Sequence, residues 1–533
     1  MEVKTEIRRE RRVRRDLGAL VSAEMIAALV LVLVIPYLIF YCYKNAYKRP
    51  KNFPPGPPSL PVYGAFWIVL AHEFSNLALA FKKLGEKYKT KIVGLYMGPV
   101  PTIVLNDPDY IREMLNRDEF DGRVDIILGR LRSYWKKLGI FFTDGYFWHI
   151  QRRFSLRYLR DYGFGRRDNT LESVVESEIK EMIDIRLNGP KFPAEKELVN
   201  GELIYLPHFF SVPFINGILQ VVVRSTFPRS EYNKLWELSR GVLLFQRSSN
   251  DMGGALSLTP WLKDVMPNYS GYKGLVTGNQ YLLNFFNKLV SEIMATHDES
   301  YDRHFLDLYI RKMKEEQREK ERSTYSVDQL VLTCTDYMFP TATAVESVLT
   351  LLVERILLQP EIQDKVHEEI DRVVGRDRLP NLDDRRNMPY TEACIREMMR
   401  FETLVPLSVP HRALCDTKIG GYDVPEGTMV SPNLMMLHMD KTIWGDPENF
   451  RPERYIVNGE LNVAKDKSLP FGAGKRLCAG ETYARQTMFQ VFSGFMQAFN
   501  ISTADGKPLK KPAPRIQGII TTIPEFWLRV VPR

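Results

Sequence analysis

The chain has 533 residues, of which 44% are hydrophobic and 26% charged, and this composition indicates a folded protein with a large core rather than a disordered chain. Its net charge is +8, but residues 1–51 hold eleven Lys and Arg against five Asp and Glu, so the remainder is nearly neutral and charge gives no case for nucleic-acid binding. The five cysteines are odd in number and widely spaced, which argues against a disulfide framework and for a reducing compartment.

The first feature along the chain is an apolar segment. Residues 25–43 read MIAALVLVLVIPYLIFYCY without a charge, and as a helix they would span roughly 28 Å, about the thickness of bilayer hydrocarbon. We expect a transmembrane anchor here, preceded by a basic extension (1–24) and followed by a basic, proline-rich hinge (44–62) and one large domain (63–533). A cleaved signal peptide and a buried core helix are the alternatives. No small-residue cleavage site follows the long apolar segment, which favours the anchor.

The pattern after the hinge predicts a mainly α-helical domain with a minor β part. Residues 87–107 have a strand-like pattern with a turn at Gly98–Pro99. Helical patterns dominate from about 107 to 200 and from 272 to 410, and short strand-like pieces return at 416–430 and 518–531.

The stretch PFGAGKRLCAG at 470–480 places one cysteine, Cys478, among glycines and cations. Zinc would need Cys or His partners at metal spacing, and a nucleophile would need a base; neither is present locally. A lone thiolate is the ligand that a haem iron with an open opposite face requires. Gly472 and Gly474 permit positive φ angles near the sulfur, and the helical pattern that follows would direct its positive N-terminal dipole at the thiolate.

The same stretch resembles the F-x-x-G-x-R-x-C-x-G motif of the cytochrome P-450 superfamily, matched by Phe471, Gly474, Arg476, Cys478 and Gly480. The resemblance extends from the hinge to the C-terminus, and stretches such as WGDPENFRPERY look like the microsomal branch of the superfamily, most like its arthropod members. It implies the cytochrome P-450 fold, preceded here by one transmembrane helix, and haem b (iron protoporphyrin IX) bound through Cys478.

The resemblance also assigns roles to residues elsewhere. Glu397 and Arg400 match the family's E-x-x-R helix, which closes a structural triad with an arginine matched by Arg454. The W-x-x-x-R pattern of Trp148 and Arg152 implies contacts with the haem propionates. The full set of cofactor-binding residues implied in this way is Arg123, Trp148, Arg152, His411, Phe471, Gly472, Arg476 and Gly480.

The chain departs from the family pattern in its central helix. Oxygen-activating members carry A-G-x-[DE]-T-T, and the matching stretch here has Pro340 and Thr341 in place of Ala-Gly. Thr343 stands where the acid would be and Ala344 where the oxygen-side threonine would be. Because an acid–alcohol pair relays protons during oxygen activation, we expect Thr343 or Thr341 to supply a hydroxyl, with Thr343 as the candidate catalytic residue. Pro340 should open the helix at this point.

The leading expectation is a membrane-anchored monooxygenase, whose haem-thiolate catalytic domain (63–533) hydroxylates a lipophilic substrate with O₂ and NADPH electrons. The chain has no nucleotide-binding glycine motif, so the electrons would come through NADPH–cytochrome reductase, with cytochrome b5 as a second donor. A basic run (Arg153, Arg157, Arg160) would steer an acidic donor to the thiolate side. Charges flanking the anchor do not decide its orientation; by resemblance, the domain lies on the cytosolic side of the endoplasmic reticulum membrane.

Two other functions remain open from the sequence. A haem-thiolate isomerase or dehydratase acting on an oxygenated lipid would need neither reductase nor the acid–threonine pair, and a non-catalytic haem sensor or carrier would need no turnover. In each case we expect an apolar pocket. Its predicted lining comes from the RSSNDMGG segment (247–254), the helix near Thr341, residues 404–409 and residues 519–520.

Overall fold

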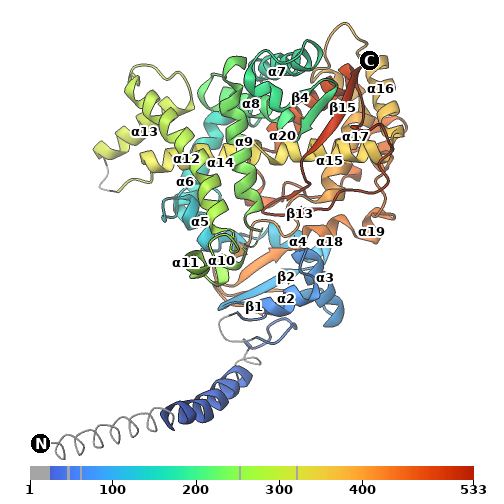
Figure 1. Cartoon of the computed structure of the whole chain (residues 1–533). Coiled ribbons are helices and arrows are strands. Elements are labelled where there is room, and N and C mark those ends of the chain that lie inside the picture. Colours follow the sequence, from blue (N-terminus) through green and yellow to red (C-terminus); the bar gives the residue numbers. More distant parts are fainter. Residues whose placement is uncertain (1–24, 45–48, 60–62, 251, 253, 320–321) are drawn as a thin grey trace, which may run out of the picture.

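The computed structural model describes residues 25–44, 49–59, 63–250, 252, 254–319 and 322–533. The predicted basic extension (1–24) lies outside the described residues, as do parts of the hinge. Figure 1 shows a helical body that meets a smaller sheet-containing part at the end nearest the N-terminal helix. The predicted class, mainly α with a minor β part, is confirmed.

The predicted anchor forms a helix over Met25–Lys44, one residue longer than expected. It is long and apolar enough to cross a membrane, and no part of it is buried against the domain. It is the one such helix in the part of the chain that the structure describes. It is therefore a candidate transmembrane segment by length and composition.

Part of the hinge docks against the domain. Arg49 donates from Nη1 to the carbonyl of Pro54 (2.9 Å) and from Nη2 to that of Gly56 (2.6 Å). The backbone N–H of Gly94 in the first strand donates to Pro55 (2.9 Å). Because proline fixes φ and leaves its carbonyl free to accept, this segment is held by its carbonyl oxygens along one edge of the sheet.

The larger sheet has five strands in the order β1-β2-β9-β6-β3. The predicted turn at Gly98–Pro99 joins β1 and β2 as an antiparallel hairpin. β9 adds parallel to β2, and β6 and β3 follow antiparallel, which places Arg123 directly opposite His411. The strands are β1 (Ile92–Met97), β2 (Val100–Leu105), β9 (Met429–Pro432), β6 (His411–Arg412) and β3 (Gly122–Arg123).

The helical body is built around two helices that follow one another, α14 and α15. A four-stranded sheet, in the order β12-β15-β5-β4, covers the end where the C-terminus lies. The principal helices are α6 (Gly145–Leu159), α7 (Asn169–Leu187), α8 (Ser211–Val223), α9 (Tyr232–Arg247), α12 (Tyr272–Ala295), α14 (Val327–Thr341), α15 (Ala344–Leu358), α16 (Glu361–Val373), α17 (Pro389–Glu402) and α20 (Glu481–Ala498). The strands of this sheet are β12 (Phe499–Thr503), β15 (Phe526–Pro532), β5 (Leu203–Leu206) and β4 (Val199–Asn200).

The helical regions and the C-terminal strand pieces agree with the sequence prediction, but residues 201–271 hold elements that it did not assign. α8 is buried at every one of its 13 positions. A helix buried all round has no polar face, so the 3.6-residue alternation that identifies a surface helix is absent. α9 was missed as well, although it has an exposed side.

Candidate functional site

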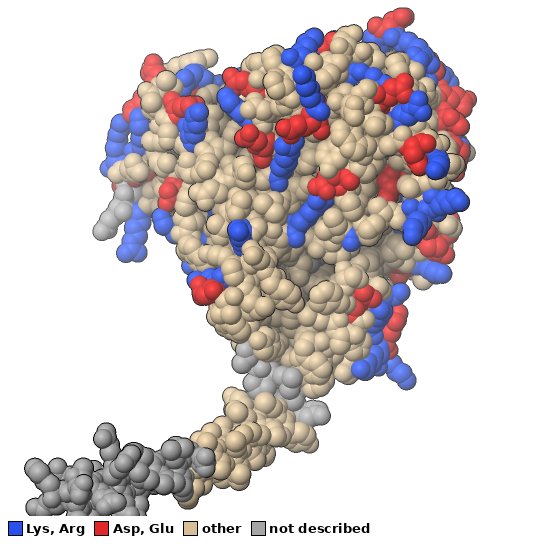
Figure 2. All heavy atoms as spheres, in the orientation of Figure 1, with Lys and Arg blue, Asp and Glu red and all other residues tan. Residues whose placement is uncertain are grey.

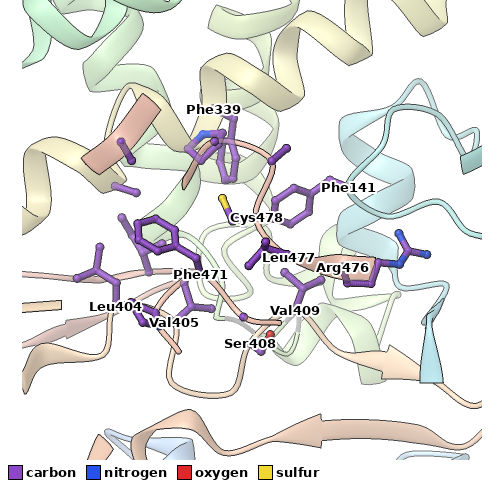
Figure 3. A pocket seen from close by; sticks show the side chains of 18 of the residues that line it. Phe141, Phe339, Leu404, Val405, Ser408, Val409, Phe471, Arg476, Leu477 and Cys478 are labelled. Atoms are coloured by element: carbon purple, nitrogen blue, oxygen red, sulfur yellow. The ribbon is translucent and has the colours of Figure 1, made fainter. Parts of the chain in front are cut away.

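Cys478 lies at one side of an internal cavity of about 300 Å³. Figure 3 shows its Sγ directed across the cavity toward Phe339, with the apolar side chains of Leu404, Val405 and Val409 nearby. Four of the five motif residues, Phe471, Arg476, Cys478 and Gly480, line this cavity, and Gly474 lies in the loop behind it. Among the described residues, no cluster of three or more His, Cys, Asp or Glu side chains could hold a metal ion, so a metal here would rely on the single sulfur.

The loop before Cys478 is shaped by its glycines. Gly472 and Gly474 have φ angles of +73° and +67°, as predicted, and such angles are strained for residues with a Cβ. At Gly474 a Cβ would also lie 2.0 Å from the carbonyl oxygen of Leu115. The backbone N–H of Cys478 closes the loop by donating to Phe471 (2.9 Å). The sulfur position is thus set by backbone geometry on both sides.

The surroundings of the Cys478 thiol shift its pKa in opposite directions. Burial raises its pKa, while a hydrogen bond from the backbone N–H of Gly480 and the charge of Arg152 lower it. α20 begins at Glu481, just after the cysteine, so the positive end of the helix dipole lies next to the sulfur. A bound cation such as a metal ion would complete the stabilisation of the thiolate.

The predicted triad is present beneath this loop. Glu397 and Arg400 are fully buried, and Arg400 Nη2 donates to Glu397 Oε1 (2.7 Å). Arg454 Nε donates to the same oxygen (3.0 Å). Arg400 and Arg454 also donate to carbonyl groups of residues 438–449, so the network ties α17 to the long segment that leads into the cysteine loop.

One edge of the cavity carries three arginines and a histidine, of which Arg123 and His411 are buried and Arg152 and Arg476 are half-buried. Arg123, Arg152, His411 and Arg476 all line it, as the resemblance implied. Burial lowers the pKa of Arg476 to about 10 and holds the pKa of His411 well below its ordinary value, so His411 is neutral and its Nδ1–H donates to Phe120 (2.6 Å). Three arginines at one edge of the cavity, without an equal number of carboxylates, indicate an anionic ligand.

Two unsatisfied donors at this edge define what such a ligand must offer. Arg123 Nη1 and Trp148 Nε1 are buried and have no hydrogen-bond partner. Trp148 does not itself line the cavity, but its ring packs under Arg476. Buried polar groups are normally paired, and a haem would present two carboxylates at this edge while its iron takes the Cys478 sulfur. The residues present therefore fit haem.

The opposite side of the cavity is formed by the junction of α14 and α15. α14 ends at Thr341 and α15 begins at Ala344, so the helix is interrupted next to Pro340 as predicted. Thr341 and Ala344 line the cavity, whereas Thr343 does not. Thr343 is fully buried, and its hydroxyl donates to the carbonyl of Phe339 (3.4 Å). A catalytic role for Thr343 stays a prediction, and the geometry favours Thr341.

The rest of the lining is largely apolar and only partly as predicted. Residues 404, 405, 408, 409, 519 and 520 contribute, in agreement with the sequence. Among the described residues of 247–254 none lines the cavity, and the neighbouring Gln246 does so instead. Ile140 and Phe141 also line the cavity but were not predicted. Figure 3 shows Phe141 beside Cys478. The apolar run at residues 138–142 was the available signal.

Comparison with known proteins agrees with this geometry. A family model described as cytochrome P450 matches residues 54–530. The chain belongs to the cytochrome P450 family. Similar P450 relatives are farnesoate epoxidase from Bombyx mori (32% identical, covering 90% of this chain and 94% of the relative), cytochrome P450 2E1 from Oryctolagus cuniculus (33%, 90% and 94%) and probable cytochrome P450 303a1 from Drosophila melanogaster (31%, 91% and 95%).

Membership of the cytochrome P450 family identifies the chain as a haem-thiolate oxidoreductase of the monooxygenase class. The sequence had indicated both the family and the resemblance to arthropod members, and the insect relatives confirm them. Cys478, in the matched motif, is the residue through which this P450 would hold its haem iron.

Proposed function

We propose that this P450 is a membrane-anchored monooxygenase that hydroxylates a lipophilic substrate with O₂ and electrons from NADPH, delivered by a separate reductase. The observation that carries the proposal is Cys478 directed into a mostly apolar cavity with a cationic edge. An apolar cavity binds molecules with extensive hydrocarbon surface. The name of the farnesoate epoxidase relative is consistent with oxygenation of a lipid.

The residues of the site would have separate roles. Cys478 would ligate the haem iron, and Arg123, Trp148, Arg152, His411 and Arg476 would hold the propionates. When bound, the haem supplies oxygen activation, which an electron-rich thiolate ligand assists. Phe471, Gly472 and Gly480 line the cavity beside the sulfur and would lie against the ring. The chain's own contribution is to position the cofactor, to exclude water with apolar side chains and to place a hydroxyl on the oxygen side.

That hydroxyl is the side chain of Thr341. Its Oγ1 donates to the carbonyl of Tyr337 (2.7 Å), which leaves its lone pairs free to accept from a water or substrate in the cavity. Ala344, at the position of the usual threonine, offers no hydroxyl. Thr343, the residue predicted from the sequence, would support the helix break through its bond to Phe339. We propose that Thr341, with ordered water, takes the proton-relay role.

The electron donor would approach the thiolate side. Arg153, Arg157 and Arg160 are exposed on α6 and just after it, and Arg152 of the same helix contacts the cysteine loop through the carbonyl of Leu477. Exposed cations near the cofactor would steer an acidic protein toward it. We propose NADPH–cytochrome reductase as the donor, with cytochrome b5 as a second one.

The membrane would meet the end of the domain nearest the anchor. This end has few charged side chains in Figure 2, over α2 (Phe66–His72), α10 (Gly254–Leu258) and α11 (Leu262–Val265). Large apolar side chains are exposed there, among them Trp67, Phe74, Trp261 and Val265. Such a patch suits the interface of a bilayer. We propose the endoplasmic reticulum membrane, with the domain on its cytosolic side.

The test is turnover by the full-length protein in membranes with a panel of lipophilic compounds, with and without NADPH and reductase. Hydroxylated product that requires both supports the proposal, while turnover without NADPH indicates an isomerase or dehydratase, and no turnover a carrier. The ferrous carbon-monoxide complex should show the absorbance typical of thiolate ligation in the wild type and lose it in Cys478→Ala. Cys415→Ala, at an exposed cysteine, is the matched control and should retain it.

A further inference from the structure

Gln246 is held firmly at the far wall of the cavity. It lies in the last turn of α9, is fully buried and lines the cavity. Its backbone carbonyl accepts from the N–H of Ile519 (2.8 Å), and Gly518 packs so closely that a Cβ there would lie 2.4 Å from the same oxygen. The backbone of Gln246 is therefore fixed between its own helix and the C-terminal segment, and its side chain starts from a defined point.

The orientation of the Gln246 amide follows from its one partner. Nε2 donates to the backbone carbonyl of Phe339, at 3.4 Å a long hydrogen bond. Phe339 lies in the last turn of α14, and its carbonyl also accepts from the hydroxyl of Thr343 (3.4 Å). A carbonyl can only accept, so the NH₂ group must face it. The opposite end of the amide, Oε1, is consequently turned away from Phe339, and no alternative flip satisfies the same contact.

Oε1 of Gln246 is buried and has no hydrogen-bond partner. Among the described residues that line the cavity, only one other has such an orphaned buried atom, Arg123 Nη1. The two differ in kind: the arginine nitrogen is a donor at the cationic edge that fits the haem propionates, whereas the glutamine oxygen is an acceptor in an otherwise apolar wall. A buried acceptor without a donor is unfavourable, and a ligand that brings a donor would relieve this cost.

The chemistry of the surroundings narrows that donor to a neutral hydroxyl. A carboxylate has only acceptors and would oppose Oε1. An ammonium group would need a counter-charge on leaving water, but the one carboxylate in the cavity lining, Asp336, is already paired with Arg132 and accepts from the backbone N–H groups of Ile140 and Phe141. An alcohol needs no counter-charge and offers one O–H.

We propose that Gln246 is the residue that recognises the substrate, by accepting a hydrogen bond at Oε1 from an alcohol group on an otherwise apolar molecule. The inference rests on the proposed monooxygenase function and deepens it: the substrate class is a hydroxyl-bearing lipid rather than a hydrocarbon, an ester or a fatty acid. The hydroxyl bound by Gln246 would fix which carbon of the skeleton faces the haem.

The direct test is titration of the full-length, haem-loaded ferric enzyme with matched pairs of an alcohol and its methyl ether, such as a sterol and its 3-methyl ether or dodecanol and its methyl ether. The spectral shift of the haem reports binding without turnover. For pairs that fit, the wild type should bind the alcohol about tenfold more tightly, because the ether brings no donor to the buried oxygen. Gln246→Leu should bind both members equally.

The matched control is Gln490→Leu. Gln490 is also a buried glutamine whose Nε2 donates to a backbone carbonyl, that of Glu172 (3.4 Å), but it lies on α20 away from the cavity lining. This variant should keep the preference for the alcohol. No preference in the wild type, or a preference that survives in Gln246→Leu, would overturn the proposal.

Thermal unfolding of the haem-loaded enzyme without lipid separates recognition from a structural role. Gln246→Leu removes an unmatched buried oxygen and should melt at or above the temperature of the wild type. A much lower melting temperature would mean that the bond to Phe339 is the purpose of the residue, and the subsite would be rejected. The ferrous carbon-monoxide spectrum distinguishes failure of the proposed function from failure of the subsite. If the wild type lacks the absorbance of a thiolate-ligated haem, the proposed function is rejected. If the absorbance is present but the alcohol is not preferred, only the subsite is rejected.

Discussion

The guanidinium carbon of Arg476 lies 3.7 Å from the centroid of the Trp148 ring. Arg476 also donates to the backbone carbonyls of Asp121 (2.8 Å from Nε) and Thr143 (3.0 Å). The ring thus supports a half-buried cation at the edge of the cavity, and the indole N–H is buried without a hydrogen-bond partner. One aromatic side chain would therefore serve the anionic edge of a bound haem twice, through its face and through its nitrogen.

Separate substitutions at Trp148 should divide these two roles. Trp148→Phe keeps an aromatic face under Arg476 but removes the N–H, so we expect haem to dissociate about three- to tenfold faster. Trp148→Ala removes both and should lose haem faster still. The measurement is haem transfer to apomyoglobin. Trp236→Phe, at a buried tryptophan on α9 whose Nε1 is also unpartnered, is the control, and an equal effect there would show general destabilisation only.

The buried triad should be costly to break. Glu397→Ala leaves Arg400 and Arg454 without their shared carboxylate in the interior, and we expect it to lower the free energy of unfolding by about 3–5 kcal/mol. Glu453→Ala is the comparison, because the Glu453–Lys365 pair is exposed and should contribute at most about 1 kcal/mol. Urea unfolding of the haem-loaded protein measures both. Similar losses in the two variants would contradict a structural role for the triad.

The ion pair of Arg132 and Asp336 should hold the loop that closes over the cavity. Asp336 Oδ2 accepts from the N–H groups of Ile140 (2.5 Å) and Phe141 (3.1 Å). Asp336→Ala removes those acceptors, so the two amides should exchange with deuterium at least tenfold faster. Asp328→Ala, which breaks only the exposed contact with Lys136 on the same loop, should leave their exchange unchanged. Hydrogen–deuterium exchange measured by mass spectrometry compares the two variants, and equal exchange in both would contradict this role for Asp336.

A buried carboxyl behind the helix break should make stability depend on pH. Glu346 is fully buried, its Oε2 has no partner, and burial raises its pKa well above the ordinary value. Its Oε1 accepts from the hydroxyl of Ser239 (3.4 Å), and the charges of Arg247 and Glu525 act on its pKa in opposite directions. His208, which contacts the same hydroxyl, is kept neutral because burial lowers its pKa to about 4. The folded state therefore holds a proton on Glu346 that the unfolded state releases near the ordinary pKa.

The sign of the effect follows from this difference in protons. Above the ordinary pKa of glutamate the unfolded state binds fewer protons, so stability falls as pH rises until Glu346 ionises in the folded state. Glu346→Gln removes this dependence. We expect the variant to gain stability over the wild type increasingly from pH 5 to pH 8, with melting temperature as the measurement. Glu361→Gln, at an exposed position of α16, should show no such trend, and a constant difference for Glu346→Gln would refute the explanation.

The features of the site that could be predicted from the sequence are those whose residues lie close together along the chain. The loop of Cys478 is built from ten consecutive residues and one helix start, so residue types and spacing were sufficient. The Glu397–Arg400 pair lies within one helical turn. Gln246 could not be found in this way, because its amide is oriented by Phe339, 93 residues further on, and its place in the cavity lining depends on how α9 packs.

Thr343 illustrates the same limit within a motif. Its position matches that of the family's acid, but the chain's own Pro340 ends α14 at Thr341 and the backbone of Thr343 is non-helical, with φ of −140°. The hydroxyl of Thr343 bonds to Phe339, and Thr341 rather than Thr343 lines the cavity. A sequence alignment gives the order of residues, but it does not give the orientation of their side chains once the helix is interrupted.

Substitution of the two threonines should reveal which hydroxyl serves oxygen activation. If Thr341 positions the water that carries protons, Thr341→Ala should raise the share of NADPH consumed that ends as hydrogen peroxide rather than product, with product formation reduced about 10- to 100-fold. Thr341→Ser retains the hydroxyl and should recover most of the product. Thr343→Ala loses only the bond to Phe339 and should stay within about threefold of the wild type. Product, NADPH and peroxide measured together give the result, and the reverse order of effects would return the role to Thr343.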